Sequence, residues 1–144
     1  MIRAAPTRAA AKRKEKTVST NEKKGTAVVT GASSGLGAVY AERLAGQGYD
    51  LILVARRTDR LQALAAEIGR KHGRQVSAFT ADLADDGDLA RLEARIAGDD
   101  TIALLVNNAG VAGQSVVAKA DAAAIARQVK VNVIALTRLT RAVL

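Results

Sequence analysis

Three closely spaced glycines follow a short apolar run, and this arrangement suits a turn that holds phosphate groups. The run Ala27–Thr30 leads into Gly31, Gly35 and Gly37. We interpret Gly31 as the residue that lets the chain turn off a strand, and Gly35 as the point where backbone approaches a phosphate without a Cβ in the way. Gly37 would let the following helix pack close to the sheet. The segment therefore predicts a strand, a turn and a helix that bind the diphosphate of a dinucleotide.

The predicted helix after this turn would complement the charge of that diphosphate. A helix that begins near Leu36 directs unpaired N–H groups and the positive end of its dipole at a bound anion. Ser33 and Ser34 add hydroxyl donors at the same bend. A glycine triplet alone is more often a structural turn, but the strand before it and the helix after it favour nucleotide binding.

The residues at the end of the second apolar run, Leu51–Ala55, bear on which dinucleotide binds. An acid there would accept hydrogen bonds from a ribose 2′-OH, whereas a base would pair with a 2′-phosphate. Arg56 and Arg57 leave this end, and their guanidinium groups suit a phosphate monoester. Asp50 precedes the run and so lies at the opposite end of the predicted strand. The sequence favours NADP(H) over NAD(H); the alternative is that both arginines are solvated loop charges.

Polar residues also follow the third and fourth apolar runs. Asp82 comes shortly after one, and Asn107 and Asn108 come directly after the other. Ligands collect at the carboxyl edge of open parallel sheets, so these side chains are candidates for ligand contact. The alternative role is structural, in which they cap turns and satisfy loop backbone. The two roles are not exclusive.

These positions presuppose parallel strands joined by helices. The apolar runs are continuous rather than alternating, as expected for strands covered on both faces. The predicted strands are Ala27–Thr30, Leu51–Ala55, Val76–Thr80 and Ile102–Val106. Strand and helix alternate, which predicts an α/β fold with a Rossmann-type doubly wound parallel sheet of strand order 3-2-1-4.

The helices between these strands are predicted from apolar spacing and from capping residues. The first covers Ala38–Gln47. The second has Thr58 as its cap and Gly69 as its stop, and the third ends at Gly98. Their apolar positions recur at helical intervals. Those positions are Leu61, Leu64, Ala65 and Ile68 in the second helix and Leu89, Leu92 and Ile96 in the third.

A long helix is predicted after Asp121, which is available as its cap. Its apolar stripe consists of Ile125, Val129, Leu136, Leu139 and Val143. Asn132 lies in this stripe, and a buried amide needs hydrogen-bond partners. It is either a satisfied core or interface amide or a functional group.

The glycine spacing, taken with two further motifs, resembles the short-chain dehydrogenase/reductase family. The family's Thr-Gly-x-x-x-Gly-x-Gly stands here as Thr30–Gly37, and its Asn-Asn-Ala-Gly stands as Asn107–Gly110. The Asp of its third strand is matched by Asp82, followed by Leu83. The resemblance covers roughly residues 25–144 and implies an NADP(H)-dependent oxidoreductase that transfers hydride between the cofactor and a carbonyl or alcohol.

The same resemblance implies roles for individual residues. Asp82 and the backbone of Leu83 would bracket the adenine, and Asn132 would match the catalytic Asn that holds a water in a proton relay. Asn107 to Gly110 would stabilise the sheet edge and line the cofactor's ribose, with Asn108, Ala109 and Gly110 as cofactor-binding residues.

One hallmark of the family is absent from this sequence. The family's proton donor lies in Tyr-x-x-x-Lys, with a Ser on the preceding strand. Leu44 and Leu53 stand four residues after Tyr40 and Tyr49, so neither tyrosine qualifies. We expect a partial domain, truncated after the fourth strand and its helix, that takes a substrate only if the missing half is supplied. The alternative is a non-catalytic nucleotide-binding or interaction module.

Such a domain would leave the helix of residues 121–144 partly uncovered. The later strands of the family would otherwise pack against it, and an exposed aliphatic stripe favours association. We therefore expect a marginally stable polypeptide or a homo-oligomer formed through residues 121–144.

Charge and composition restrict the other possibilities. Residues 1–24 hold eight basic and two acidic residues and so carry most of the net charge of +8. We predict a disordered, solvated basic tail over 1–24; the alternatives are contact with a polyanion and an Arg-rich organelle-targeting peptide. The small charge of the rest disfavours nucleic acid as a partner. The chain has no Cys and one His, so we predict no metal site. No apolar run reaches the roughly 18 residues of a membrane span, and we expect a cytoplasmic protein.

Overall fold

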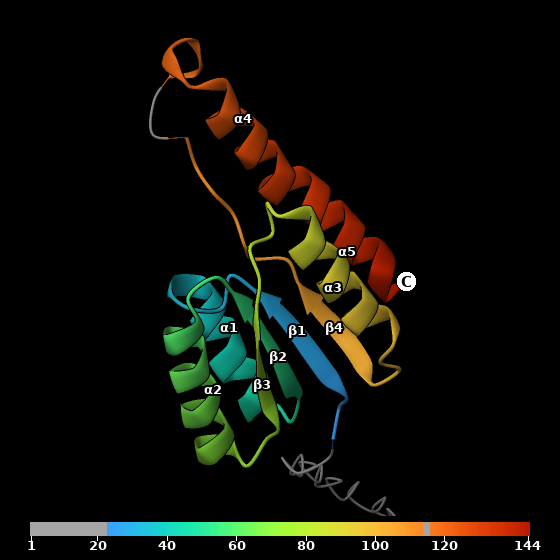
Figure 1. Cartoon of the computed structure of the whole chain (residues 1–144). Helices are drawn as coiled ribbons and strands as arrows, with labels where there is room; N and C mark the ends of the chain where they lie inside the picture. Colours follow the sequence, from blue (N-terminus) through green and yellow to red (C-terminus); the bar gives the residue numbers. More distant parts are fainter. Residues whose placement is uncertain (1–22, 114–115) are drawn as a thin grey trace, which may run out of the picture.

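A four-stranded parallel sheet forms the centre of the molecule (Figure 1). The computed structural model describes residues 23–113 and 116–144. The strands are β1 (Thr26–Thr30), β2 (Asp50–Ala55), β3 (Val76–Thr80) and β4 (Ile102–Val106). Their order is β3-β2-β1-β4, with every pair parallel. The predicted α/β fold and strand order are confirmed. The predicted tail over 1–24 falls almost entirely on residues 1–22, which lie outside the described residues.

Helices cover both faces of this sheet, with α1 and α2 on one side and α3 and α5 on the other (Figure 1). The helices that connect the strands are α1 (Gly35–Gly46), α2 (Thr58–His72) and α3 (Asp86–Ala97). After β4 come the 3₁₀ turn η1 (Val117–Lys119), α4 (Ala122–Val129), the π-helical segment η2 (Lys130–Ala135) and α5 (Leu136–Val143). Figure 1 shows α4 projecting beyond the edge of the sheet at which the strands end.

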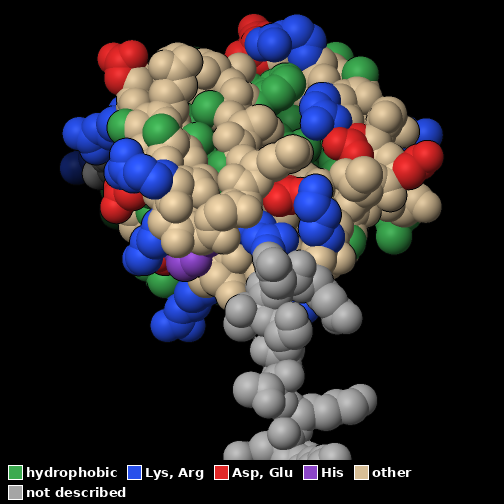
Figure 2. Space-filling view, turned by 90° about the horizontal axis from the view of Figure 1, so that it is seen from below, with side chains coloured by type: hydrophobic (Ala, Val, Ile, Leu, Met, Phe, Trp, Pro, Cys, Tyr) green, Lys and Arg blue, Asp and Glu red, His purple; other side chains and the backbone are tan. Residues whose placement is uncertain are grey.

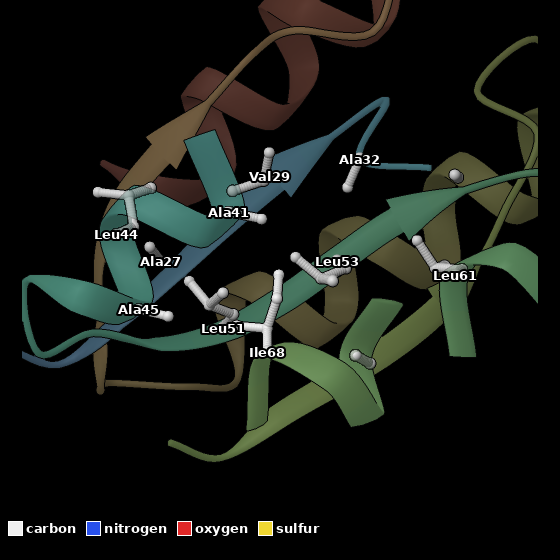
Figure 3. Close-up of a cluster of buried hydrophobic side chains, with 12 residues drawn as sticks. Ala27, Val29, Ala32, Ala41, Leu44, Ala45, Leu51, Leu53, Leu61 and Ile68 are labelled. Atoms are coloured by element: carbon white, nitrogen blue, oxygen red, sulfur yellow. The ribbon is translucent and has the colours of Figure 1, made fainter. Parts of the chain in front are cut away.

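The core consists of two layers separated by the sheet. Ala27 and Val29 of β1 pack in the layer beneath α1 and α2 (Figure 3), whereas Val28 between them packs against α3 and α5. This alternation follows from the strand period of two, and it explains why the buried strands read as continuous apolar runs. Ala41 and Ala45 of α1 are buried in the first layer, so small side chains allow α1 to approach the sheet closely.

Both ends of α2 differ from the sequence-based prediction. The N-cap position is Arg57, and Thr58 is the first helical residue, with its hydroxyl 3.0 Å from the hydroxyl of Thr80. The helix continues past Gly69 to His72 and ends at Gly73, whose φ of +62° is left-handed. The Gly69 carbonyl accepts the hydrogen bonds that close this end. The two glycines therefore share the termination, because only the second takes the conformation that requires glycine.

The predicted apolar stripe after Asp121 is right at its end and wrong before it, because Leu139 is buried and Val143 packs against the second core layer but the earlier positions are exposed. Asp121 stands at the N-cap of α4, but its side chain makes no capping hydrogen bond. The residues buried in this region are Val131, Ala135 and Leu139, whereas Ile125, Val129 and Leu136 are exposed. The physical reason is η2, because a π turn inserts a residue and rotates the helical face that meets the core.

A charged pair fastens α5 to α3. Nε and Nη2 of Arg138 donate to the two carboxylate oxygens of Glu93, with Nε at 2.9 Å from Oε1. These hydrogen bonds hold the pKa of Glu93 below its ordinary value, outweighing its partial burial. The same two helices also share a buried contact, because Leu139 packs in the second core layer with the buried residues of α3.

Glu93→Gln should make the fold less stable at neutral pH and less sensitive to acid. Because the folded-state pKa of Glu93 is lowered, its contribution is present above the unfolded pKa of about 4.3 and is lost as the pH falls through the folded value. The free energies of unfolding of the parent chain and E93Q, measured in urea, should therefore differ at pH 7 and become equal near pH 2. Glu67→Gln, at an exposed position of α2, is the control. A difference between parent and E93Q that stays constant with pH would contradict the assignment.

The face of the molecule at which the strands begin has mixed charge. In Figure 2, which views this side, Lys and Arg side chains lie scattered with Asp and Glu among them. Within the described residues, no helix is both long and apolar enough to cross a membrane, and no cluster of three potential metal ligands occurs.

Candidate functional site

A cleft of about 300 Å³ lies at the carboxyl edge of the sheet. It is the place where the chain leaves β1, β2, β3 and β4 and where α4 projects past the sheet (Figure 1). Ten of the residues singled out from the sequence line it. They are Gly31, Ser33, Ser34, Arg56, Arg57, Asp82, Leu83, Asn108, Ala109 and Gly110. The topology thus gathers residues from four separate loops into one site.

The glycine turn is packed too tightly for side chains at two of its three positions. A Cβ on Gly37 would lie 2.3 Å from the Gly31 carbonyl oxygen and 2.6 Å from Nδ2 of Asn108. A Cβ on Gly31 would lie 2.8 Å from Cα of Ala109. At Gly35 the φ is +58° and no atom lies within 4 Å of the Cβ position. The backbone there borders open space, which is the arrangement that close approach of a ligand requires.

Helix α1 begins at this open position. Gly35 is its first residue, its first turn carries no acidic side chain, and Ser34 at the N-cap makes no side-chain capping hydrogen bond. The first N–H groups of a helix have no intrahelical acceptor, so this end has donors available for an anion. Leu36 is 70% exposed beside them. Gly35, Leu36 and Gly37 form the start of the helix rather than the cleft wall.

Thr30 connects the glycine turn to the loop after β4. Its hydroxyl is buried, accepts hydrogen bonds from the backbone N–H groups of Asn108 and Ala109 at 3.0 Å each, and donates to the Val106 carbonyl at 3.3 Å. Nδ2 of Asn108 donates in return to the carbonyls of Thr30 and Gly31, at 3.0 and 3.3 Å. The structural role considered for Asn108 is therefore present, and the same residue lines the cleft.

Asn107 also has structural partners. Its amide donates to the Thr140 hydroxyl at 3.0 Å and to the Leu136 carbonyl at 3.4 Å. It therefore joins the end of β4 to α5 and does not line the cleft.

Arginine side chains border the cleft where β2 ends. Arg56 and Arg57 both line it, and Nη2 of Arg57 donates to the Ser34 hydroxyl at 3.2 Å. This contact joins the β2 end to the glycine turn. Asp50 lies at the opposite end of β2, where its carboxylate accepts the Gln75 N–H and pairs with Lys23. The predicted placement of Asp50 at the start of the strand, opposite the end that carries Arg56, is confirmed.

The Asp82 carboxylate is held at the cleft by several donors. Nη2 of Arg127 lies 3.0 and 2.8 Å from its two oxygens, and the Ala84 N–H donates to Oδ1 at 3.0 Å. Partial burial raises the pKa of Asp82, but these hydrogen bonds and the charges of Arg127 and Arg56 hold it below its ordinary value. The Asp82 backbone N–H donates to Asp88 of α3 at 2.8 Å, so the loop is fixed on both sides.

Asn132 lies in η2, outside the cleft wall. Its Oδ1 accepts the Val111 N–H at 2.9 Å and its Nδ2 donates to the Val111 carbonyl at 2.8 Å. Both ends of the amide are thus satisfied, as expected for a polar residue among apolar neighbours. The pair of hydrogen bonds joins the π segment to the loop that begins at Asn107.

Several residues of the site were given no role from the sequence. Thr30 stands first in the glycine motif, and it had a local signal because it is a hydroxyl residue at the end of an apolar strand. Arg127 and Val131, which line the cleft from the helical region after β4, had a weaker one. They are spaced by four residues, yet the π segment makes their face impossible to assign from periodicity alone.

Comparison with known families agrees with this architecture. A family model described as short chain dehydrogenase matches residues 25–144, which span the sheet, its helices and the whole cleft. The chain belongs to the short-chain dehydrogenase family. Members of this family bind a nicotinamide dinucleotide, and the cleft at the carboxyl edge of the sheet is where the structure holds the family's glycine and asparagine motifs.

Solved structures of the family resemble the chain closely in backbone. A short-chain dehydrogenase from Sphingobium yanoikuyae in complex with NADPH has a TM-score of 0.81 and 48% identity, over 83% of this chain and 47% of that one. The bulky-bulky ketone specific alcohol dehydrogenase from Comamonas testosteroni has a TM-score of 0.81 and 41% identity, over 83% and 48%. The chain therefore spans about half the length of these short-chain dehydrogenases.

Curated relatives include a very-long-chain 3-oxoacyl-CoA reductase from Neurospora crassa, which is 46% identical over 92 residues. That alignment covers 61% of this chain and 27% of the relative. Human 17-beta-hydroxysteroid dehydrogenase type 3 is 39% identical over 85 residues, covering 59% and 27%. The chain thus matches about a quarter of each of these relatives.

Proposed function

We propose that this short-chain dehydrogenase chain binds NADP(H) in the cleft and supplies the cofactor-binding part of an oxidoreductase acting on a carbonyl or alcohol. The observation that carries the proposal is the meeting of the glycine turn and two arginines in one cleft. A diphosphate would lie at Gly31, Gly35 and the start of α1, where backbone donors face open space. The NADPH complex of the Sphingobium relative supports the same cofactor class.

The remaining lining residues fit other parts of the dinucleotide. Arg56 and Arg57 would hold the 2′-phosphate, and Asp82 with the backbone of Leu83 would contact the adenine. Asn108, Ala109 and Gly110 would line the ribose. The cleft contains three arginines and one carboxylate, so its net positive charge suits a ligand with several phosphates.

The bound nicotinamide would supply the hydride, while this chain's residues bind and orient it. Asn132 is proposed to support the site indirectly. Its side chain hydrogen-bonds to the Val111 backbone and so holds the π segment η2 against the loop after β4. Proton transfer to a carbonyl needs a donor with a tuned pKa, and this sequence holds no Tyr-x-x-x-Lys. We therefore propose that the chain alone binds cofactor but does not turn over a substrate.

Replacing both cleft arginines, in R56Q/R57Q, should weaken NADPH binding by about 30-fold, because each guanidinium can donate charge-assisted hydrogen bonds to the 2′-phosphate. NADH affinity should change by less than about threefold. Titration of each dinucleotide against the purified chain, by calorimetry, measures both values.

Arg60→Gln is the matched control, because Arg60 lies in the first turn of α2 and outside the cleft wall. It removes one positive charge from the same region without removing a proposed ligand contact. Equal affinities of the unmodified chain for NADPH and NADH would refute the arginine assignment, and no binding of either would refute the proposed function.

Three other expectations stay predictions. Association through residues 121–144 would use the exposed apolar side chains of α4, η2 and α5. These are Ile125, Val129, Val133, Ile134 and Leu136. A cytoplasmic location and the absence of a nucleic-acid partner likewise rest on composition alone.

A further inference from the structure

The ion pair between Asp82 and Arg127 joins two parts of the cleft wall that lie 45 residues apart in the sequence. Asp82 follows β3, whereas Arg127 lies in the last turn of α4, a helix with no buried residue. Both side chains line the cleft and are partly exposed, at 35% and 39%. The contact therefore belongs to the wall of the proposed cofactor site rather than to the hydrophobic core.

The hydrogen-bond donors around the Asp82 carboxylate leave one of its acceptor positions unoccupied. A carboxylate has about four acceptor positions, two on each oxygen. Oδ1 accepts from the Ala84 N–H and from Arg127, and Oδ2 accepts from Arg127 alone. Among the described residues, one position on Oδ2 thus remains for a ligand donor. The guanidinium also restrains rotation of the carboxylate, so this acceptor has a fixed direction.

The residue after Asp82, Leu83, offers a hydrogen-bond donor. The Leu83 backbone N–H has no hydrogen-bond partner within residues 23–113 and 116–144, although the N–H groups on both sides of it are bonded. Leu83 lines the cleft beside Asp82. An acceptor and a donor therefore stand next to each other, and this pair matches a base edge with an amino group beside an unprotonated ring nitrogen.

We propose that Arg127 is a specificity-determining positioning residue, which holds Asp82 so that the cleft accepts adenine and rejects a 6-oxopurine base. The inference rests on the proposed NADP(H) site. A 6-oxopurine presents a carbonyl and a ring N–H in place of the amino group and ring nitrogen of adenine. Its carbonyl would face the fixed Asp82 carboxylate and its N–H would face the Leu83 N–H. Both contacts would be repulsive, so the site would discriminate against the 6-oxopurine through unfavourable contacts.

A purely structural role for Arg127 predicts something different. If the ion pair only ties α4 to the sheet, its loss would change stability and the affinity for both dinucleotides alike. Lys130 provides the comparison, because its Nζ donates to Asp86 at 3.0 Å and so ties η2 to the start of α3. Lys130 does not line the cleft. Lys130→Met therefore removes a similar ion pair without changing the Asp82 carboxylate or the Leu83 N–H.

The test measures binding of NADP⁺ and of its hypoxanthine analogue to the full chain by calorimetry. The unmodified chain and K130M should prefer NADP⁺ by at least about tenfold, the size expected when buried polar groups would be left mispaired. In Arg127→Met the preference should fall to about threefold or less, because only the Ala84 N–H would still orient the carboxylate, through Oδ1, and Oδ2 would lose its donor. Arg127→Lys keeps one charged donor and should fall between them.

Two results would overturn the inference while leaving the proposed function in place. One is equal affinity of the unmodified chain for both dinucleotides. The other is a preference in R127M as large as in K130M. Thermal melting of each variant shows whether it folds, and R127K provides the measurement if R127M does not. Failure of the unmodified chain to bind either dinucleotide would overturn both the inference and the proposed function.

Discussion

Gly37→Ala is expected to lower NADPH affinity about 100-fold and the free energy of unfolding by about 3 kcal/mol. The added methyl group would lie 2.3 Å from the Gly31 carbonyl oxygen and 2.8 Å from its carbonyl carbon. These are backbone atoms, so no side-chain rotation relieves the contact. Either α1 moves away from β1 or the turn opens, and both changes displace the donors proposed to hold the diphosphate.

Asn108 makes this substitution more damaging. Its Nδ2 would lie 2.6 Å from the new methyl group, and the same nitrogen donates to the carbonyls of Thr30 and Gly31. Moving the amide would leave these two carbonyls, which are partly buried, with fewer donors. The strain at Gly37 is therefore transmitted to the loop after β4, which packs directly against the glycine turn.

Gly46→Ala is the matched control, because it adds the same methyl group to the same helix. Its nearest neighbour would be the His72 ring at 3.5 Å, an ordinary contact. That variant should be neutral or more stable by up to about 1 kcal/mol. Urea unfolding and NADPH titration measure both effects. A Gly37→Ala variant with the parent's stability and affinity would show that the turn is not close-packed as described.

The parts of the fold that could be predicted are those with a local signal. Val76–Thr80 and Ile102–Val106 are bounded as predicted, because each is a short apolar run between polar loops. The glycine turn could be predicted for the same reason, since a strand, a turn and a helix each have a sequence pattern within a few residues. Gly98 ends α3 as predicted, where the apolar spacing stops.

The errors arise where tertiary structure decides between local alternatives. Both Gly69 and Gly73 could end a helix, and the choice depends on which carbonyl receives the closing hydrogen bonds. The face of the helical region after β4 depends on the π segment at Lys130–Ala135, and no periodicity reveals an inserted residue. Arg127 was missed because its approach to Asp82 depends on how α4 lies against the cleft, which no local pattern in the sequence indicates.

Thr30→Val tests whether one hydroxyl holds the two halves of the site together. Valine keeps the branched shape and the β propensity of threonine, so packing in the strand is nearly unchanged. The hydroxyl, however, is the acceptor for the N–H groups of Asn108 and Ala109. Thr30 is 1% exposed, so water has no access to replace it. Two backbone donors would lose their acceptor, and an unsatisfied buried group costs about 1–3 kcal/mol.

We therefore expect T30V to be destabilised by about 2–4 kcal/mol, whereas Thr30→Ser, which keeps the hydroxyl and loses one methyl group, should lose only about 1 kcal/mol. Urea unfolding of the two variants gives the comparison, and a T30V chain that cannot fold while T30S does would agree with it. Equal stability of T30V and T30S would mean that the Asn108 and Ala109 donors find other acceptors. The loop after β4 would then be held by Asn108 and the glycine turn alone, and the cleft would not depend on Thr30.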